Sequence, residues 1–198
     1  MNAPRSRTRL SPDARRAQLL DAAKDMVIAN GLQAFTMEGL AREAGVSAPL
    51  VYNYFDGRPQ LLQELLVREY RLFVEEITEA LRDAEGFGDI VRIYVTSNFD
   101  HHAPGNILPL LQSQPEIASA IRADQQRIGR RNARFLVQSA AERYQLTKAQ
   151  AQLAVSMSSG ASIAAAELAA NANLDRTETI ELAVNYILSG IEQIGGSK

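Results

Sequence analysis

The side chains best suited to metal or acid–base chemistry are two adjacent histidines, His101 and His102, which follow Asp100. Consecutive helical residues point about 100° apart, so neighbouring imidazoles on a regular helix cannot hold one metal ion. The chain has no cysteine, no P-loop, no dinucleotide-binding glycine pattern and no spaced set of carboxylates and histidines. We therefore expect no catalytic site, no metal and no cofactor, and we expect the histidines to cap a helix or face solvent.

Anion binding is a second kind of chemistry, and it is suggested by the distribution of charge. The whole chain has a net charge of −2, but residues 1–60 hold 8 basic and 6 acidic side chains, against 13 and 17 in residues 61–198. Only one acid, Asp13, accompanies the five arginines of the first 16 residues, which are Arg5, Arg7, Arg9, Arg15 and Arg16. Basic residues clustered at one end are typical of a phosphate contact. The arm that carries Arg5, Arg7 and Arg9 could lie along DNA or enter a minor groove, and a solvated tail explains the same residues equally well.

The elements that would position such contacts lie between Thr36 and Arg58. Leu40, Ala41 and Ala44 give a short helix one apolar face, and Gly45 is a residue type that often ends a helix. Ser47 then stands where a cap is expected, with Pro49 in the first turn of a second helix. Two helices joined by a short turn that contains glycine form a helix-turn-helix.

This segment resembles the DNA-binding segment of the TetR (tetracycline-repressor-like) transcriptional regulators over about residues 18–66. The resemblance is carried by Thr36, Leu40-Ala41, Gly45-Val46-Ser47, Tyr52, Tyr54-Phe55 and Arg58. By this resemblance, the residues expected to hold DNA phosphates are Thr36, Ser47, Tyr52 and Arg58, and Met37 is expected at the DNA as well. Those expected beside the bases of the major groove are Ala48, Pro49, Leu50 and Asn53.

The expected base-reading positions depart from what sequence-specific binding favours. Ala48, Pro49 and Leu50 have no side-chain hydrogen-bond donor, so they can only pack against thymine methyl groups. Glu38, on the preceding helix, could only accept a hydrogen bond, and Gly39 costs that helix about 1 kcal/mol relative to alanine. The basic arm and DNA shape are therefore expected to carry more of the specificity.

The rest of the chain predicts only helices. We expect an all-α fold of about nine helices, with a helix-turn-helix domain over residues 1–58 and an effector-binding and dimerisation domain over residues 59–198. A helix from Pro59 to about Arg82 should tie the two domains together, and a long helix is expected over 115–144. No strand pattern or internal repeat is present.

The resemblance implies that the C-terminal helices enclose a site for a small-molecule effector. Such sites are mostly apolar with a few placed polar groups. The residues expected to line it, with plain core or surface positions as the alternative, are Tyr94, Asn98, Phe99, Leu108, Leu111, Gln112, Gln126, Arg130 and Met157. The last two helices, one rich in alanine, are expected to pair with those of a second copy in a homodimer.

Together these features predict a ligand-responsive transcriptional regulator, a repressor released from a near-palindromic double-stranded DNA operator by a small molecule. Two alternatives remain open, namely an activator or corepressor-dependent regulator of the same fold, and a small all-α enzyme. The absence of cysteine, of a signal peptide and of a long apolar run favours a cytoplasmic protein with no membrane partner.

Overall fold

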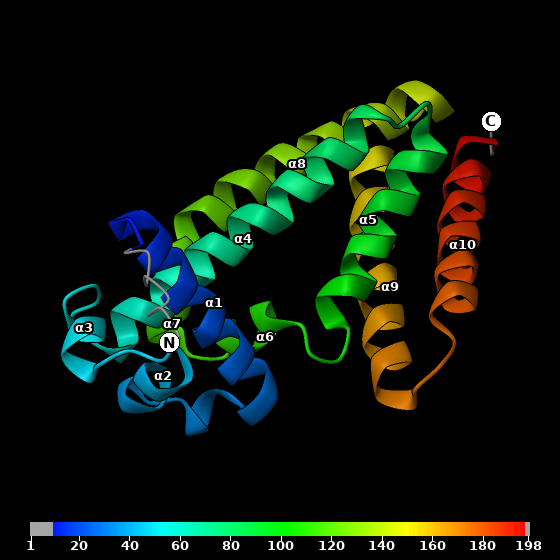
Figure 1. The fold of residues 1–198 in the computed structure, drawn as a ribbon. Coiled ribbons are helices and arrows are strands. Elements are labelled where there is room, and N and C mark those ends of the chain that lie inside the picture. The colour runs from blue at the N-terminus through cyan, green and yellow to red at the C-terminus, as the bar shows by residue number, and fades with distance from the viewer. Residues whose placement is uncertain (1–9, 197–198) are drawn as a thin grey trace, which may run out of the picture.

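The protein is described here over residues 10–196 of a computed structural model, and the arginines expected in the arm, Arg5, Arg7 and Arg9, lie outside this range. The all-α prediction is confirmed, and the described residues form no strand. They form ten α-helices and two 3₁₀ turns (Figure 1). The elements are α1 (Pro12–Asn30), η1 (Leu32–Ala34), α2 (Met37–Glu43), α3 (Ala48–Tyr52), α4 (Arg58–Arg82), α5 (Phe87–His102), α6 (Ile107–Gln112), α7 (Pro115–Ala118), η2 (Ser119–Ile121), α8 (Arg122–Tyr144), α9 (Lys148–Ala172) and α10 (Arg176–Gly196).

The long helix expected over 115–144 is the one place where the helix prediction is wrong. It is interrupted by η2, where the Ser119 hydroxyl donates to the carbonyl of Glu116 at 2.7 Å and Ile121 leaves helical geometry at φ −114°, ψ 0°. The interruption separates the direction of α7 from that of α8. Ile117 and Ile121 are both buried against the first half of α4, whereas in α8, which follows, only Ala140 is buried.

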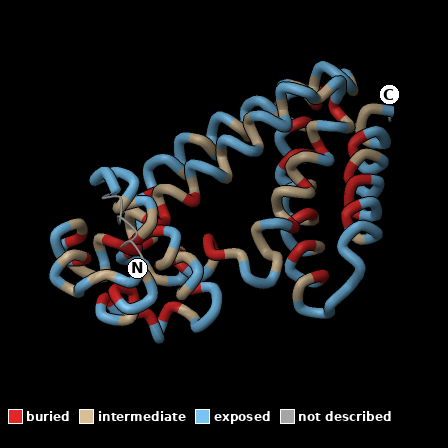
Figure 2. The backbone as a smooth tube through the Cα atoms, viewed as in Figure 1, coloured by how far each residue is buried: buried red, intermediate tan, exposed pale blue. Residues whose placement is uncertain are grey.

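Buried side chains gather in two separate cores, which appear as two groups of red in Figure 2. The first core joins α1, α2 and α3 to the start of α4, and it also takes in Leu108 and Leu111 of α6 and Ile117 of α7. The second core joins α5, α9, α10 and the end of α8. The helix-turn-helix unit is therefore completed by side chains that lie as much as 60 residues further along the chain.

Two helices, α4 and α8, run side by side from the first core to the second (Figure 1). Leu61, Leu62, Leu65 and Leu66 of α4 are fully buried in the first core, whereas the C-terminal half of α4 has no buried residue. In α8 only Ala140 is buried, and it belongs to the second core. Both helices act as struts between the cores. The start of α4 is fixed in the first core and the end of α8 in the second, while the far half of α4 contacts α5 without a buried residue.

The buried face of α5 is set by Phe87, Val91, Val95 and Phe99, which recur every four residues. They pack on α9 and α10 in the second core. Tyr94, one position from this stripe, is only half-buried and lies beside α4 and α8 instead. This placement brings Tyr94 to the space between the two struts.

Charged side chains attach α1 to α4 in addition to the apolar core. The carboxylate of Glu69 is only 7% exposed, and it accepts from Lys24 Nζ at 2.7 Å and from Arg68 Nη2 at 2.8 Å. Arg68 also reaches Asp21 of α1 at 2.7 Å. The guanidinium of Arg16 pairs with Glu64 and lies 4.7 Å from the centre of the Phe55 ring.

By length and composition alone, α9 (Lys148–Ala172) is the one helix among the described residues that could cross a membrane, and this does not conflict with the expectation that the protein has no membrane partner. Several of its large apolar side chains face outward, including Leu153, Met157 and Leu168. Interface helices also combine this composition with an exposed apolar side.

Replacing Glu69 tests the attachment of α1 to α4. We expect Glu69→Gln to lower the free energy of unfolding by about 1–2 kcal/mol, because it leaves Lys24 and Arg68 without their shared carboxylate in a largely buried site. Urea unfolding followed by circular dichroism measures the change. Glu75→Gln, on the exposed face of the same helix, is the matched control and should change stability by less than about 0.5 kcal/mol. Equal losses of stability in the two variants would contradict the role of Glu69 in attaching α1 to α4.

Candidate nucleic-acid interface and effector cavity

The turn between α2 and α3 has the geometry that the sequence predicts. Gly45 adopts φ +64°, and the amide of Val46 donates to the carbonyl of Ala41 at 2.9 Å, which closes the end of α2. Val51 and Phe55 are buried beneath α3. The two short helices are therefore held at a fixed angle by the first core.

Polar groups at the N-termini of both helices face solvent. Thr36 caps α2, where its hydroxyl accepts from the amide of Gly39 at 3.0 Å. Ser47 occupies the N-cap position of α3, but its hydroxyl makes no hydrogen bond with a described residue. Pro49 has no amide hydrogen, and the amide of Leu50 donates to the carbonyl of Ser47 instead. The exposed Ser47 hydroxyl and the helix N-terminus beside it are free for an anion such as a phosphate.

Tyr52 and Asn53 are exposed. The hydroxyl of Tyr52 donates to Glu38 of α2 at 3.3 Å, and partial desolvation and the nearby carboxylate both raise the pKa of Tyr52. Pro49 is exposed as well, whereas Ala48 and Leu50 are half-buried.

Two residues expected at the DNA are placed differently by the structure. The side chain of Met37 is buried in the first core, because the first turn of α2 faces α1, so only its backbone amide could meet a phosphate. Arg58 is half-buried, and its guanidinium donates to the carbonyls of Leu32 at 2.8 Å and Phe35 at 3.3 Å. The Arg58 guanidinium therefore satisfies backbone carbonyls in and after η1. The position of Arg58 in the sequence did not indicate this role.

The unusual glycine of α2 has a packing reason. A Cβ atom at Gly39 would lie 2.9 Å from the Thr36 hydroxyl oxygen and 3.0 Å from the terminal methyl of Met26 in α1. A side chain here would disturb the cap of α2 and its contact with α1 together. Glycine has a low helix propensity, and the close packing of α2 on α1 explains why it is present here.

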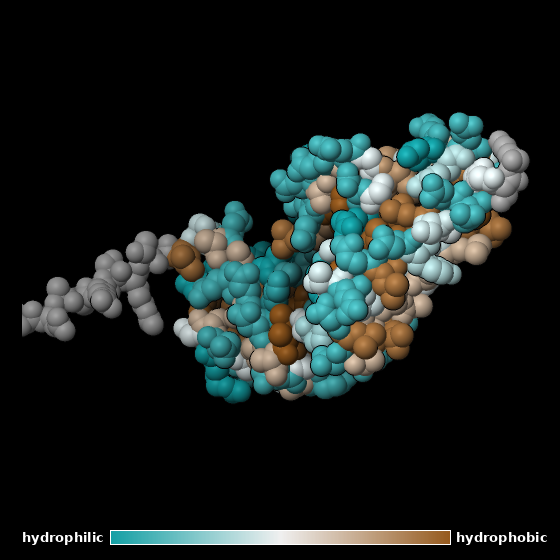
Figure 3. Space-filling model, turned by 90° about the vertical axis from the view of Figure 1, so that its right-hand side faces the viewer, coloured by the Kyte–Doolittle hydropathy of each residue, from teal (hydrophilic) through white to brown (hydrophobic). Residues whose placement is uncertain are grey.

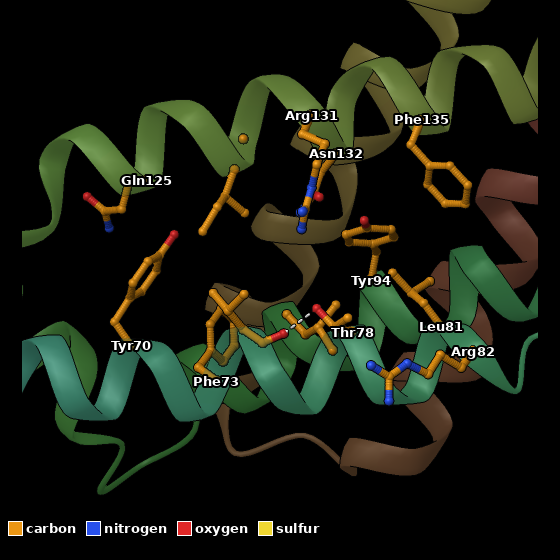
Figure 4. Close-up of a pocket in the computed structure, with 14 residues that line it drawn as sticks. Tyr70, Phe73, Thr78, Leu81, Arg82, Tyr94, Gln125, Arg131, Asn132 and Phe135 are labelled. Carbon is orange, nitrogen blue, oxygen red and sulfur yellow. Dashed lines mark hydrogen bonds between the residues drawn. The ribbon is translucent and has the colours of Figure 1, made fainter.

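An open groove of about 480 Å³ lies between α4 and α8 (Figure 4). Its lining is largely apolar and aromatic, with Tyr70, Phe73 and Leu81 from α4 and Phe135 from α8 pointing across the gap. Arg82, Arg131, Gln125 and Asn132 add polar groups, and no aspartate or glutamate lines the groove. A space of this size, with this mixture, suits a small organic ligand.

Tyr94 of α5 stands between this groove and a second cavity of about 250 Å³, formed by α5, α8, α9 and α10. Its hydroxyl is buried and has no hydrogen-bond partner in the described part of the chain. Burial raises the pKa of Tyr94, and the positive charge of Arg131 acts in the opposite direction. An unsatisfied buried hydroxyl costs stability unless something supplies a partner.

The residues predicted for the effector site lie in several different places in the structure. Tyr94 and Asn98 line the cavities, and Asn98 also donates to the Ser162 hydroxyl at 2.9 Å. Phe99, Leu108 and Leu111 are buried core residues, and the half-buried Gln112 lines neither cavity.

Gln126, Arg130 and Met157 are exposed outside both cavities. On α8 the groove is lined by Gln125 and Arg131. Each lies one residue, or about 100° around the helix, from the predicted Gln126 or Arg130. The α4 residues Tyr70, Phe73 and Leu81 were missed, because an apolar stripe that lines a cavity reads like one that fills a core.

The two histidines sit at the end of α5, with ring centres 5.2 Å apart. The Nδ1 atom of His102 lies 2.9 Å from the carbonyl oxygen of Asn98, and its Nε2 lies 3.6 Å from Glu167. His101 is half-buried against Phe73, and burial, helped by His102, lowers its pKa. Within residues 10–196 no cluster of three or more histidine and acidic side chains could hold a metal ion.

Removing the buried hydroxyl of Tyr94 should stabilise the ligand-free protein. We expect Tyr94→Phe to raise the free energy of unfolding by about 1 kcal/mol, because it deletes an unsatisfied polar group and keeps the ring. Urea unfolding of protein that has been refolded to remove ligands measures this. Tyr70→Phe, whose hydroxyl is not buried in this way, is the control and should be neutral. A loss of stability in Tyr94→Phe would mean that the hydroxyl has a partner.

Comparison with known proteins agrees with this architecture. The sequence model of the family described as "Bacterial regulatory proteins, tetR family" matches residues 19–65, which span most of α1, both helices of the helix-turn-helix and the start of α4. The transcriptional activator FasR of Mycolicibacterium smegmatis is 31% identical over 120 residues, covering 58% of this chain and 55% of FasR. The chain thus matches about half the length of this curated relative.

Two solved structures share the fold of the whole chain. A TetR-like transcriptional regulator from Rhodococcus sp. RHA1 superposes with a TM-score of 0.66 at 23% identity, covering 92% of this chain and 98% of that one. FadR from Bacillus subtilis, solved with stearoyl-CoA, gives a TM-score of 0.60 at 19% identity, covering 92% and 98%. Residues 19–65 match the sequence model of the tetR family of bacterial regulatory proteins, and the chain has the fold of the TetR-like structures.

Proposed function

We propose that the protein is a DNA-binding transcriptional regulator whose α2–α3 unit contacts an operator. The observation that carries this proposal is the free hydroxyl of Ser47 at the N-terminus of α3, in a helix-turn-helix whose Thr36 and Tyr52 are exposed as well. Phosphate contacts of this kind fix the register of a protein on DNA. The half-buried Ala48 and Leu50 leave base reading to methyl contacts and to DNA shape.

Regulation by a ligand is supported by the position of the groove between the two struts. Both α4 and the η2 turn before α8 contribute to the core of the helix-turn-helix unit, and beyond it α4 contacts α5 while α8 joins the second core. A molecule wedged between them would change the direction in which the DNA-binding unit is held. Ligand and DNA would then affect each other's affinity by the same factor. The domain boundary at 58/59 is part of this proposal, with 1–58 binding DNA and 59–198 binding the effector.

A homodimer is supported by the exposed apolar surface of α9 and α10. The exposed residues are Leu153, Met157, Ile163, Leu168, Leu174, Leu182 and Tyr186, and brown apolar side chains are visible on this side of the molecule in Figure 3. Two such helices from each subunit form a four-helix interface. A dimer would place two α3 helices on the two halves of a near-palindromic site.

The two candidate functions, repressor and activator, differ in the direction of regulation. We propose a repressor that its ligand releases from DNA, and the activator reading is favoured by the name of FasR, a transcriptional activator. The enzyme alternative is set aside, because the curated relatives are named as transcriptional regulators.

The decisive experiment is selection of bound fragments from genomic DNA of the source organism, followed by footprinting at two salt concentrations. We expect a short near-palindrome whose protection weakens steeply with salt. Protein refolded away from any copurified ligand serves as the matched sample. Sequence-indifferent binding by both samples would overturn the proposal, and the sign of the ligand effect on operator affinity separates repressor from activator.

Alanine variants of Ser47 and Thr36 form a matched pair that tests the proposed DNA contacts. We expect Ser47→Ala to weaken operator binding about tenfold with little change in stability, because its hydroxyl caps no amide. Thr36→Ala should weaken binding and also cost about 1 kcal/mol of stability, because that hydroxyl caps α2. Fluorescence anisotropy with labelled operator and urea unfolding give the two readouts. Unchanged DNA affinity in both variants would contradict the assignment of this surface.

The dimer is tested at the most exposed apolar positions of α10. We expect Leu182→Arg to give monomers and to weaken operator binding about 100-fold or more, because the two half-sites are no longer held together. Sedimentation velocity and anisotropy measure the two effects. Leu72→Arg, at an exposed leucine on α4, is the control that should remain dimeric. A Leu182→Arg protein that stays dimeric would place the interface elsewhere.

A further inference from the structure

Two buried polar atoms without a hydrogen-bond partner lie on the same face of α5. Within residues 10–196 they are the Tyr94 hydroxyl and the Nδ1 atom of His101. Residues seven apart on a helix point within about 20° of each other, so both side chains face the same neighbour. That neighbour is α4, because Tyr94 lines the groove beside Phe73 and the ring centre of His101 lies 6.0 Å from that of Phe73. The contact between α4 and α5 therefore contains polar atoms that it does not satisfy.

The packing of His101 on Phe73 joins the two cores. Phe73 of α4 packs against the first core, whereas Phe99, two residues before His101, is buried in the second. The first core holds the helix-turn-helix unit, and the second holds α9 and α10. This contact therefore helps to set the orientation of the helix-turn-helix unit relative to α9 and α10.

Other contacts hold the end of α5 to the last two helices. Asp100 is paired with Arg176 of α10, and the Nε2 atom of His102 lies 3.6 Å from Glu167 of α9. The Nδ1 atom of His102 lies 2.9 Å from the carbonyl oxygen of Asn98, so both nitrogens of this ring have an acceptor nearby. A proton on His102 thus leaves α5 attached to α9 and α10.

A proton on His101 has no such acceptor at Nδ1. A neutral imidazole keeps one nitrogen as an acceptor, but in the charged ring both nitrogens are donors. Burial lowers the pKa of His101, and the charge of His102 lowers it further. Above the ordinary histidine pKa of about 6.5 the neutral ring is stable where it packs. As the pH falls below that value, the packed form loses up to about tenfold per pH unit relative to a form whose ring faces water.

The other titratable groups around this contact come from four helices. They are Tyr70 and Glu76 of α4, Asp124, Arg127 and Arg131 of α8, Glu167 of α9, and Arg176 and Glu181 of α10. Among the described residues, His102 is the group whose charge acts on the pKa of His101. The response of His101 is therefore set by the burial of its own ring and by its neighbour in α5.

We propose that His101 forms a pH-sensitive contact between the two cores, which is closed when its neutral ring packs on Phe73 and released when the ring is protonated. Release frees α4 from the end of α5, while Glu167 and Arg176 keep α5 in the second core. The helix-turn-helix unit is then less firmly oriented, and fixing it on an operator costs more conformational freedom. Operator binding should therefore weaken in acid. Simple charge predicts the opposite, because a less negative protein is attracted more strongly to phosphates.

NMR titration of the full-length protein tests the contact directly, since the chain has only two histidines. His102→Gln assigns the remaining imidazole curve to His101, and we expect that curve to lie below the ordinary pKa of about 6.5. The second readout is the equilibrium constant of folding, measured by urea unfolding. Between about pH 7.5 and about pH 5.5 it should fall about three- to tenfold more in the wild type than in His101→Phe, which keeps a ring against Phe73 but takes no proton.

His102→Gln is the matched control at the adjacent position, and it should keep the pH dependence of the wild type. Circular dichroism checks that each variant is folded, and His101→Leu replaces His101→Phe if the larger ring does not fit. Titration of His101 at or above its ordinary pKa overturns the inference. Equal loss of stability in the wild type and in the His101 variants overturns it as well.

Operator affinity is measured on the same samples by fluorescence anisotropy at constant ionic strength. We expect the wild type and His102→Gln to bind about tenfold more weakly at about pH 5.5 than at about pH 7.5, and His101→Phe to change by less than about twofold. Specific binding by the wild type that does not weaken in acid overturns the inference. Absence of specific binding at every pH removes the proposed function instead, and the histidine titration and the folding equilibrium still decide whether the contact is pH-sensitive.

Discussion

The attachment of α1 to α4 is the constraint on which the rest of the structure depends. Four fully buried leucines at the start of α4 close the first core, and Glu69, held by Lys24 and Arg68, aligns the two helices beside them. The helix-turn-helix unit is too small to bury its own apolar face, so α4, α6 and α7 complete it. Any movement of α4 is therefore transmitted directly to the surface that carries Ser47 and Tyr52.

The groove lies between α4, which this attachment fixes, and α8. Between their fixed ends α4 and α8 are weakly packed on each other, and they leave an apolar space where a core would otherwise continue. An empty apolar space lowers stability, because its lining lacks contacts that a ligand can supply. The loosely packed struts are also the part of the molecule best able to adopt two arrangements. In the proposed mechanism, ligand binding and the orientation of the DNA-binding unit are linked through this pair of helices.

Sequence patterns predicted some elements well because their determinants are local. The turn at Gly45 and the two short helices on either side of it follow from residue type and helical spacing. The break at η2 was missed, because no proline or glycine marks it and its cause is the burial of Ile117 and Ile121 on α4. The groove residues of α8 were placed one position away, because Ile128 and Phe135 do not show which flank of the helix faces a partner.

The sequence by itself determined the all-α class, the helix-turn-helix and the family resemblance, since these depend on contacts within about 20 residues of chain. Only the tertiary structure decided that Arg58 binds backbone carbonyls, that Met37 is buried and that Gly39 accommodates Met26. It alone brought Tyr94, Gly129 and Arg82 around one space. These outcomes depend on packing between helices far apart in sequence, and a helical pattern specifies which residues share a face but not which surface that face meets.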